Sequence, residues 1–409
     1  MNKQILIFCN IIKNVIHQEQ ASHLEGDIDW SYMVELAKKH NLLAICLEEA
    51  IKYPLYTERF VYHQEIQEVM GIISTQIRRT EDFLQLYQSF ADANIYPVVV
   101  KGLVCRQLYG EMSDHRPSGD EDILIRPEEF RKAQAILNSQ GYFSDIKIED
   151  DAQLQWIQEV SFTHPVKKLH VELHLNLMGR ENDVRSRMTD YFSDVFENYR
   201  EIMINGVCVR TMNHQQHLVY LIFHAFKHFV GNGFGMRQMV DILLYHEQYA
   251  VEIDLIELKK TLSEYKVDIF WNDILHIGNS YLGFNLPVVQ ELNFSNELLE
   301  DVIECGVFGN KTEAGYIAAR ATVMATGDCL KHKKINTVRM IWRAIFPNKE
   351  YLLSHSSYLN DRPWLLPIAW LKRWGRFVKK NIKHKGNLTG ESLKISHRRL
   401  KLMKKYKLI

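Results

Sequence analysis

Three acidic residues near the middle of the sequence have the type and spacing for metal-assisted phosphate chemistry. Asp120 and Asp122 are two residues apart in the segment Asp-Glu-Asp-Ile-Leu-Ile, which has the composition of a strand. Residues two apart on a strand point to the same face of a sheet, so both carboxylates would leave it together. Glu172 lies on the polar face of a later strand. If the two strands are neighbours, three carboxylates meet at one place.

Carboxylates held that close disfavour joint ionisation unless a cation neutralises them. Oxygen ligands favour Mg²⁺ or Mn²⁺ over softer metals. Two such ions, about 3.5–4 Å apart, would hold the attacking and leaving oxygens of a phosphoryl transfer. The alternative is that Asp120 and Asp122 are solvated acids near a turn and that Glu172 faces water, as one face of an antiparallel sheet usually does.

The segment before the aspartate pair offers groups that can bind phosphate. Lys101 and Gly102 stand between a short strand and a short helix. Glycine lets the backbone approach a ligand closely, the first N–H groups of a helix attract anions, and lysine adds a positive charge. Arg116, in the loop that also holds Gly119, can contact a phosphate through two N–H groups. A plain strand-to-helix turn and a solvated loop arginine are the alternatives.

The elements that must position these residues change in type along the chain. Residues 1–94 repeat apolar side chains at three- and four-residue steps, which indicates helices. Residues 95–212 predict an α/β core, helices return over 213–345, and 346–409 form a basic, aromatic tail. Within the core we predict strands at 96–100, 120–125, 168–177 and 201–211, with helices at 103–109 and 127–140. The fold class is therefore α+β, with a small mixed sheet flanked by helical regions on both sides.

The strand expected over residues 168–177 alternates strictly between apolar and polar residues. One face carries Leu169, Val171, Leu173, Leu175 and Leu177, and the other carries His170, Glu172, His174 and Asn176. Because the side-chain period of a strand is two residues, the same face that presents Glu172 also presents His174.

Composition and length exclude several classes of protein. The chain has 409 residues, of which 46% are hydrophobic and 24% charged, enough for a sizeable core and unlike a disordered or collagen-like chain. The six cysteines are scattered, so neither a zinc ribbon nor a disulfide framework is indicated. The first 13 residues resemble an amphipathic helix more than a signal peptide, and no apolar run approaches the ~20 residues of a membrane span. We expect a cytoplasmic protein without a transmembrane segment.

The charge is zero overall but uneven along the chain. Residues 371–409 hold 14 of the 50 Lys and Arg residues and one acid, so the first 370 residues carry a net charge of −13. The tail also contains Trp374 and Phe377. A basic segment with aromatic residues suits docking on the acidic body, which we favour, or contact with an anionic surface such as a membrane or RNA. Peripheral membrane association is therefore the alternative to a purely cytoplasmic location.

The order of these motifs resembles the DNA polymerase beta-type nucleotidyltransferase superfamily, and more narrowly a bacterial, largely uncharacterised nucleotidyltransferase group. The resemblance rests on Val-Lys101-Gly, on Arg116-Pro-Ser-Gly-Asp-Glu-Asp122, on Val-Glu172-Leu-His174, and on the helical segment His224-Ala-Phe-Lys227-His228, with Arg237 and Asp241 downstream. It implies an NTP substrate, with Mg²⁺ or Mn²⁺ bound by Asp120, Asp122 and Glu172. His174 matches the family's histidine two residues after the third carboxylate.

Two departures from the pattern concern the phosphate-binding part. The residue between the aspartates is usually aliphatic, whereas here it is Glu121, which strand periodicity points away from the metal face. Many members of the wider fold carry a Gly-Ser pair after the first strand, where this chain has Lys101 and Gly102. The residues that we expect to contact nucleotide or phosphate are Lys101, Gly102, Arg116, Gly119, His174 and Lys227.

His224 and His228 are four residues apart on a helix and share a face. They could hold zinc, but no third ligand is evident, and a structural or substrate-contacting role is favoured over a metal site.

The leading functional hypothesis is a metal-dependent nucleotidyltransferase that moves an NMP from an NTP to an acceptor hydroxyl and releases pyrophosphate. The acceptor, whether small molecule, sugar, protein or RNA, is not indicated by the sequence. A catalytically silent nucleotide-binding module or scaffold is the alternative. A glycosyltransferase that uses Asp-x-Asp to hold a metal and a sugar nucleotide fits the Lys-Gly turn poorly.

Overall fold

The computed structural model of the chain describes residues 2–18, 27–59, 61–146, 148, 150, 151, 154, 157–179, 183–231, 233–288, 290, 291, 293–307, 346, 363–372, 375, 399 and 401–408. The helices expected between residues 308 and 345, and most of the basic tail, including Trp374 and Phe377, lie outside these described residues.

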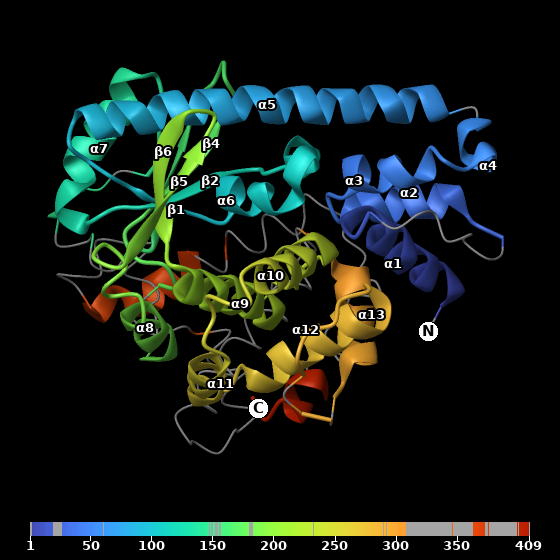
Figure 1. Cartoon of the computed structure of the whole chain (residues 1–409). Helices are drawn as coiled ribbons and strands as arrows, with labels where there is room; N and C mark the ends of the chain where they lie inside the picture. Colours follow the sequence, from blue (N-terminus) through green and yellow to red (C-terminus); the bar gives the residue numbers. More distant parts are fainter. Residues whose placement is uncertain are drawn as a thin grey trace.

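A six-stranded mixed sheet forms the centre of the molecule (Figure 1). Its strands are β1 (Val98–Val100), β2 (Glu121–Leu124), β3 (Glu159–Thr163), β4 (His170–His174), β5 (Tyr199–Ile204) and β6 (Val207–Met212). The order across the sheet is β3-β4-β2-β1-β6-β5. Strand β2 is parallel to β4 and β1 is parallel to β6, while the other neighbours are antiparallel. The expected mixed sheet with helical flanks is confirmed.

Helices precede, interrupt and follow the sheet. Before it come α1 (Lys3–Ile16), α2 (Trp30–Lys39), α3 (Leu43–Ala50), α4 (Pro54–Thr57) and α5 (Tyr62–Asp92). Between strands lie α6 (Gly102–Arg106), the 3₁₀ helices η1 (Gln107–His115) and η2 (Pro127–Glu129), α7 (Phe130–Ser139) and α8 (Asp183–Asp190). After it come α9 (His214–Val230), α10 (Met236–Gln248), α11 (Leu255–Glu264), α12 (Asp268–Tyr281), α13 (Ser295–Cys305) and the 3₁₀ helix η5 (Pro363–Leu365).

The segment predicted over 201–211, with a turn at Asn205 and Gly206, is the hairpin of β5 and β6. Its turn lies at these two residues, both with positive φ, as in a type I′ hairpin turn. Strand β3 was not predicted, because the loop-like residues before it hide a five-residue alternation in which Val160 and Phe162 are buried.

The two faces of the sheet pack against different helices. One face, with Val99 and Ile123, shares a hydrophobic cluster with α5 and α7. The opposite face, with Val100 and Leu124, belongs to a larger cluster that includes α9 and α10. Figure 1 shows the long helix α5 along one side of the sheet and α9 and α10 on the other. Because strand side chains alternate, Asp122 must face α9 and α10 whereas Glu121 faces α6 and the α5 side.

The end of the chain packs against the helical part. Leu402, Met403 and Leu408 are almost completely buried, and Arg399 forms an ion pair with Asp301 of α13. Residues 401–408 therefore dock on the rest of the chain, whereas the docking predicted for Trp374 and Phe377 lies outside the described residues. Contact of residues 371–409 with an anionic surface stays a prediction.

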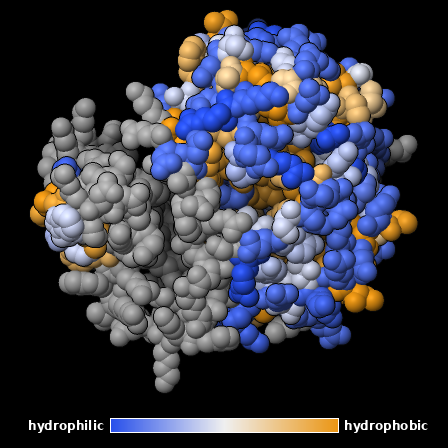
Figure 2. Space-filling view, turned by 90° about the vertical axis from the view of Figure 1, so that its left-hand side faces the viewer, coloured by the Kyte–Doolittle hydropathy of each residue, from blue (hydrophilic) through white to orange (hydrophobic). Residues whose placement is uncertain are grey.

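The surface of the described residues is largely hydrophilic in the view of Figure 2, with hydrophobic residues in smaller patches between them. Trp364 and Leu371 are exposed near the start of the tail segment. Among the helices of the described residues, none is both long enough and apolar enough to cross a lipid bilayer.

Candidate active site

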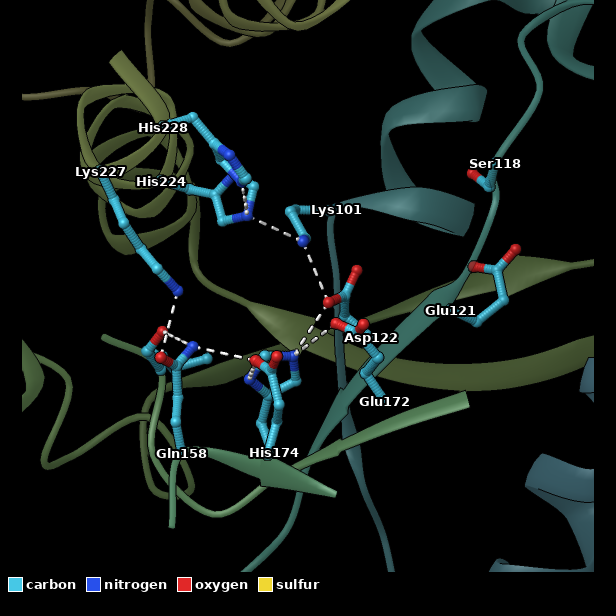
Figure 3. A network of polar contacts seen from close by, with 12 residues as sticks. Lys101, Ser118, Glu121, Asp122, Gln158, Glu172, His174, His224, Lys227 and His228 are labelled. Atoms are coloured by element: carbon cyan, nitrogen blue, oxygen red, sulfur yellow. Dashed lines mark hydrogen bonds and ion pairs between the residues drawn. The ribbon is translucent and has the colours of Figure 1, made fainter. Parts of the chain in front are cut away.

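Asp122 and Glu172 lie directly opposite each other on two parallel strands. They are register partners in β2 and β4, so their side chains leave the same face of the sheet. One ligand atom each of Asp122, Glu172 and His174 can be chosen so that all three lie within 4.8 Å of one another. Figure 3 shows the three side chains pointing toward one another. We call these three residues the carboxylate–histidine cluster.

Asp120 lies at the same cavity as Asp122, although it is not part of strand β2. Residue 120 precedes the first residue of β2, so the two-residue repeat does not fix its direction. Its side chain lines the same cavity as Asp122 but is not part of the carboxylate–histidine cluster. Burial, and then the charge of Asp122, raises the pKa of Asp120 above its ordinary value. The third carboxylate is thus near the site, and its role as a ligand stays a prediction.

Glu121 points to the opposite face, as expected, and there it occupies the N-terminus of α6. Its Oε1 accepts from Nη2 of Arg106 at 2.8 Å, and its Oε2 accepts from the backbone N–H of Leu103 at 2.9 Å. A Cβ at Gly102 would lie 2.5 Å from Oε2, so glycine is required by this carboxylate. The expectation that the N-terminus of α6 is open to a phosphate is therefore wrong for the Leu103 N–H group.

Lys101 projects into the site from a strained backbone position. Its φ is +52°, which a non-glycine residue adopts rarely and at a cost. Its Nζ lies 3.0 Å from Oδ1 of Asp122 and 3.1 Å from Nε2 of His224. Burial lowers the pKa of Lys101, but the carboxylates of Asp122, Asp120 and Glu172 overcome this and raise it well above its ordinary value. Lys101 is therefore a fixed cation at the carboxylates.

His174 forms the other contact of Asp122. Its Nε2 lies 2.9 Å from Oδ1 of Asp122 and 3.7 Å from Oε2 of Glu172. Burial opposes protonation, but hydrogen bonds to these two carboxylates raise the pKa of His174 to about 9. Although Asp122 is buried, Lys101 and His174 hold its pKa below the usual range of an aspartate. In this arrangement two cations share one carboxylate.

Helix α9 supplies the wall opposite the sheet. His228 Nε2 lies 3.2 Å from Nε2 of His224, whose pKa is lowered far below its ordinary value, first by burial and then by the charge of Lys101. Lys227 donates to Oε1 of Gln158 at 3.1 Å, as Figure 3 shows. A neutral His224 accepts from Lys101 and so helps to position this lysine.

Arg116 makes different contacts from those expected. Its Nε and Nη2 donate to the two oxygens of Asp241, at 3.0 and 2.6 Å. Its Nη1 donates to Oγ of Ser118 at 2.8 Å. Because these donors are occupied, Arg116 braces the loop before β2 against α10. In this structure Arg116 therefore offers no bidentate contact to a phosphate. The sequence did not reveal this, because Asp241 lies 125 residues away.

The site opens into a cavity of about 270 Å³ between the sheet and helices α9 and α10. Every residue expected from the sequence to contact metal or nucleotide lines it, namely Lys101, Gly102, Arg116, Gly119, Asp120, Asp122, Glu172, His174 and Lys227. Asp241 also lines it. Other residues of the lining were not predicted to be there, among them Gln158 and Glu159, and Arg237 had been given no role. The alternation of Glu159 with Val160 could have revealed Glu159, whereas Gln158 precedes β3 and that alternation does not fix its direction.

The order of elements agrees with a nucleotidyltransferase-like core on a mixed sheet with helical flanks. The family model described as "uncharacterised nucleotidyltransferase" matches residues 26–283, more than half of the chain. The chain belongs to this nucleotidyltransferase family. Comparison with curated proteins and with solved structures gives no match.

Proposed function

We propose that the protein is a metal-dependent nucleotidyltransferase that transfers an NMP from an NTP to an acceptor hydroxyl. The observation that carries the proposal is the register of β2 and β4, which sets Asp122 beside Glu172 on the cavity side of the sheet. Membership in the nucleotidyltransferase family supports the same reaction class. The nucleobase and the acceptor stay open.

The residues at this point fit a divalent cation. Two carboxylates and one imidazole lie close enough to share an ion, and Nε2 of His174 faces both carboxylates. Asp122 and Glu172 would hold Mg²⁺ or Mn²⁺, with Asp120 within the same cavity, and His174 would join them once it loses its proton. Such an ion supplies positive charge that stabilises the phosphoryl oxygens and lowers the pKa of a bound hydroxyl.

The chain's own residues bind and orient the substrate. Lys101 and Lys227 place two ammonium groups at the cavity, and these neutralise phosphate oxygens. The oxygen of the acceptor hydroxyl bonds to the α-phosphorus, and the bond from that phosphorus to the bridging oxygen of the β-phosphate breaks, so that pyrophosphate leaves. The hydroxyl proton passes to the carboxylate of Glu172, whose side chain stays 26% exposed.

Labelled nucleotides test the proposal directly. The full-length protein is incubated with Mg²⁺ or Mn²⁺ and each α-labelled NTP, against a panel of acceptors and against itself as acceptor, and pyrophosphate release is recorded. We expect label transfer that Asp122→Asn reduces by at least about 10³-fold, because one ligand and one counter-charge of the reacting centre are lost. Transfer that survives this change would refute the assignment.

The alternative of a silent nucleotide-binding module is supported by one feature. The ammonium of Lys101 already neutralises Asp122 without a metal ion, at 3.0 Å. A protein that keeps this ion pair when nucleotide binds would hold the ligand without reaction. Saturable ATP binding with no pyrophosphate release from any NTP would favour this function.

A further inference from the structure

Arg237 is a buried arginine in the cavity that has no ion-pair contact among the described residues, although the charges of Asp241 and Asp120 partly offset its burial. It is the second residue of α10, is 9% exposed, and lines the same cavity as the carboxylate–histidine cluster. One of its Nη groups donates to the backbone oxygen of Pro117. Its Nε is buried without a hydrogen-bond partner, and it forms no ion pair with any of the residues that the structure describes.

The neighbouring aspartate is already occupied. Arg237 and Asp241 are one helical turn apart and share a face of α10. Both oxygens of Asp241 accept from Arg116, and one of them also accepts from the hydroxyl of Tyr109 at 2.9 Å. Burial, and then the charge of Arg116, lowers the pKa of Arg237 to about 10. Arg237 therefore keeps its charge at neutral pH although its surroundings disfavour it.

An unpaired buried charge is costly, so a binding partner that supplies negative charge is indicated. The guanidinium group has five N–H donors in a planar fork, which match the oxygens of a phosphate. Only one contact of that fork is used within the described part of the chain.

The surroundings of Arg237 leave room for such a ligand. A Cβ built at Gly119 would meet no atom within 4 Å, so the loop before Asp120 is open on that side. Arg237 also stands in the first turn of α10, where the helix dipole adds positive potential. The loop and the helix are held together by Arg116 and Asp241, so the geometry is fixed before a ligand arrives.

The placement also indicates which phosphates are bound. In Figure 3, Lys227 and Gln158 lie on one side of Asp122, and Ser118 lies on the other. Ser118 directly follows Pro117, the residue that Arg237 contacts. The α-phosphorus that reacts must lie at the carboxylates of Asp122 and Glu172. The guanidinium group of Arg237, held beside Ser118, therefore reaches the phosphates that follow the α-phosphate.

We propose that Arg237 is the arginine that binds the β- and γ-phosphates of the NTP, the part that leaves as pyrophosphate. Arg116, which the sequence favours for this contact, is instead the residue that positions the loop. The inference rests on the proposed function, because it names a substrate contact of that same site.

The test measures binding of inorganic tripolyphosphate by titration calorimetry, with EDTA present so that no metal contributes. The full-length protein is compared with Arg237→Gln, Arg237→Lys and Arg131→Gln. Arg131 lies on α7, outside the cavity, in an exposed ion pair with Asp151, so its loss controls for the removal of one positive charge. We expect the Kd to rise about 10- to 100-fold in Arg237→Gln, less in Arg237→Lys, and not at all in Arg131→Gln.

Thermal unfolding distinguishes a ligand contact from a structural role. Arg237→Gln removes an unpaired charge, so its Tm without ligand should match or exceed that of the unchanged protein, and tripolyphosphate should raise its Tm less. A clear loss of Tm without ligand, together with an unchanged Kd, would overturn the inference. So would an unchanged protein that binds no tripolyphosphate.

The outcome is separable from that of the proposed function. If Arg237→Gln loses tripolyphosphate binding while no NTP is ever transferred, Arg237 binds phosphate but the proposed reaction is wrong. If transfer occurs and Arg237→Gln keeps both the Kd for tripolyphosphate and the KM for NTP, only the inference about Arg237 is wrong. If this variant weakens binding of a nucleoside monophosphate but not of tripolyphosphate, the assignment to the β- and γ-phosphates fails.

Discussion

Two consecutive residues of β2 have the same burial and different surroundings. Glu121 and Asp122 are each 1% exposed, and each carries a basic partner. Glu121 is enclosed by Arg106 and the start of α6 and does not line the cavity of Asp122. Asp122 faces a cavity, shares its Oδ1 between Lys101 and His174, and stands beside Glu172. Burial of a carboxylate alone therefore does not mark a reactive site; crowding of charges at a cavity does.

We expect the largest difference between Glu121 and Asp122 when each carboxylate is replaced by its amide, because one change should affect stability and the other activity. Glu121→Gln leaves the buried charge of Arg106 without a counter-charge, which should lower the free energy of unfolding by about 3–5 kcal/mol. Asp122→Asn should abolish nucleotide transfer in protein that is still folded. Urea unfolding measures the change in stability of both variants. The transfer assay, run under conditions in which both variants are folded, measures the change in activity. If folded Glu121→Gln loses nucleotide transfer as completely as Asp122→Asn, the distinction between the two carboxylates is wrong.

Asp273 is another buried carboxylate, but the groups that donate hydrogen bonds to it are neutral. It accepts from the hydroxyl of Tyr406 at 2.5 Å and from the backbone N–H of Phe294 at 2.7 Å. Burial raises the pKa of Asp273 to about 6, whereas the cations beside Asp122 lower the pKa of that residue. For these two buried aspartates, the charge of the hydrogen-bond partners, and not the burial, sets the direction of the pKa shift.

A raised pKa in the folded state means that the folded protein binds the proton more tightly than the unfolded chain. The contribution of Asp273 to stability is therefore full below about pH 4 and declines as the pH rises from about 4 to 6, by about 3 kcal/mol. Asp273→Asn should flatten this part of the curve, measured by urea unfolding between pH 4 and 7. A variant whose pH profile parallels that of the unchanged protein would contradict this reading.

Local patterns in the sequence were sufficient for most of the strands, β3 excepted, and for the direction of several side chains. The alternation around Glu172 correctly placed Glu172 and His174 on one face, and the two-residue period correctly turned Glu121 away from Asp122. The family and the mixed α+β fold are confirmed. These features depend on near neighbours in the chain, where strand periodicity and short motifs carry the information.

Contacts between distant segments were not predictable in this way. Arg116 looked like a phosphate ligand because nothing near it in the sequence reveals Asp241. The N-terminus of α6 was predicted to be open to a phosphate. The contact that Glu121 makes there depends on the pairing of β1 with β2, which the sequence does not show. Arg237 drew no attention as a ligand because an arginine early in a helix is ordinary until its burial is known.

Binding of Mn²⁺ to the full-length protein tests most directly whether Asp122 and Glu172 together hold a divalent cation. The free ion is followed by its electron paramagnetic resonance signal during titration of the unchanged protein, Asp122→Asn and Glu172→Gln, with Glu121→Gln as the control. The account predicts saturable binding that weakens at least about 10- to 100-fold in both cluster variants and persists in the control. Equal Mn²⁺ affinity in all four proteins would contradict it.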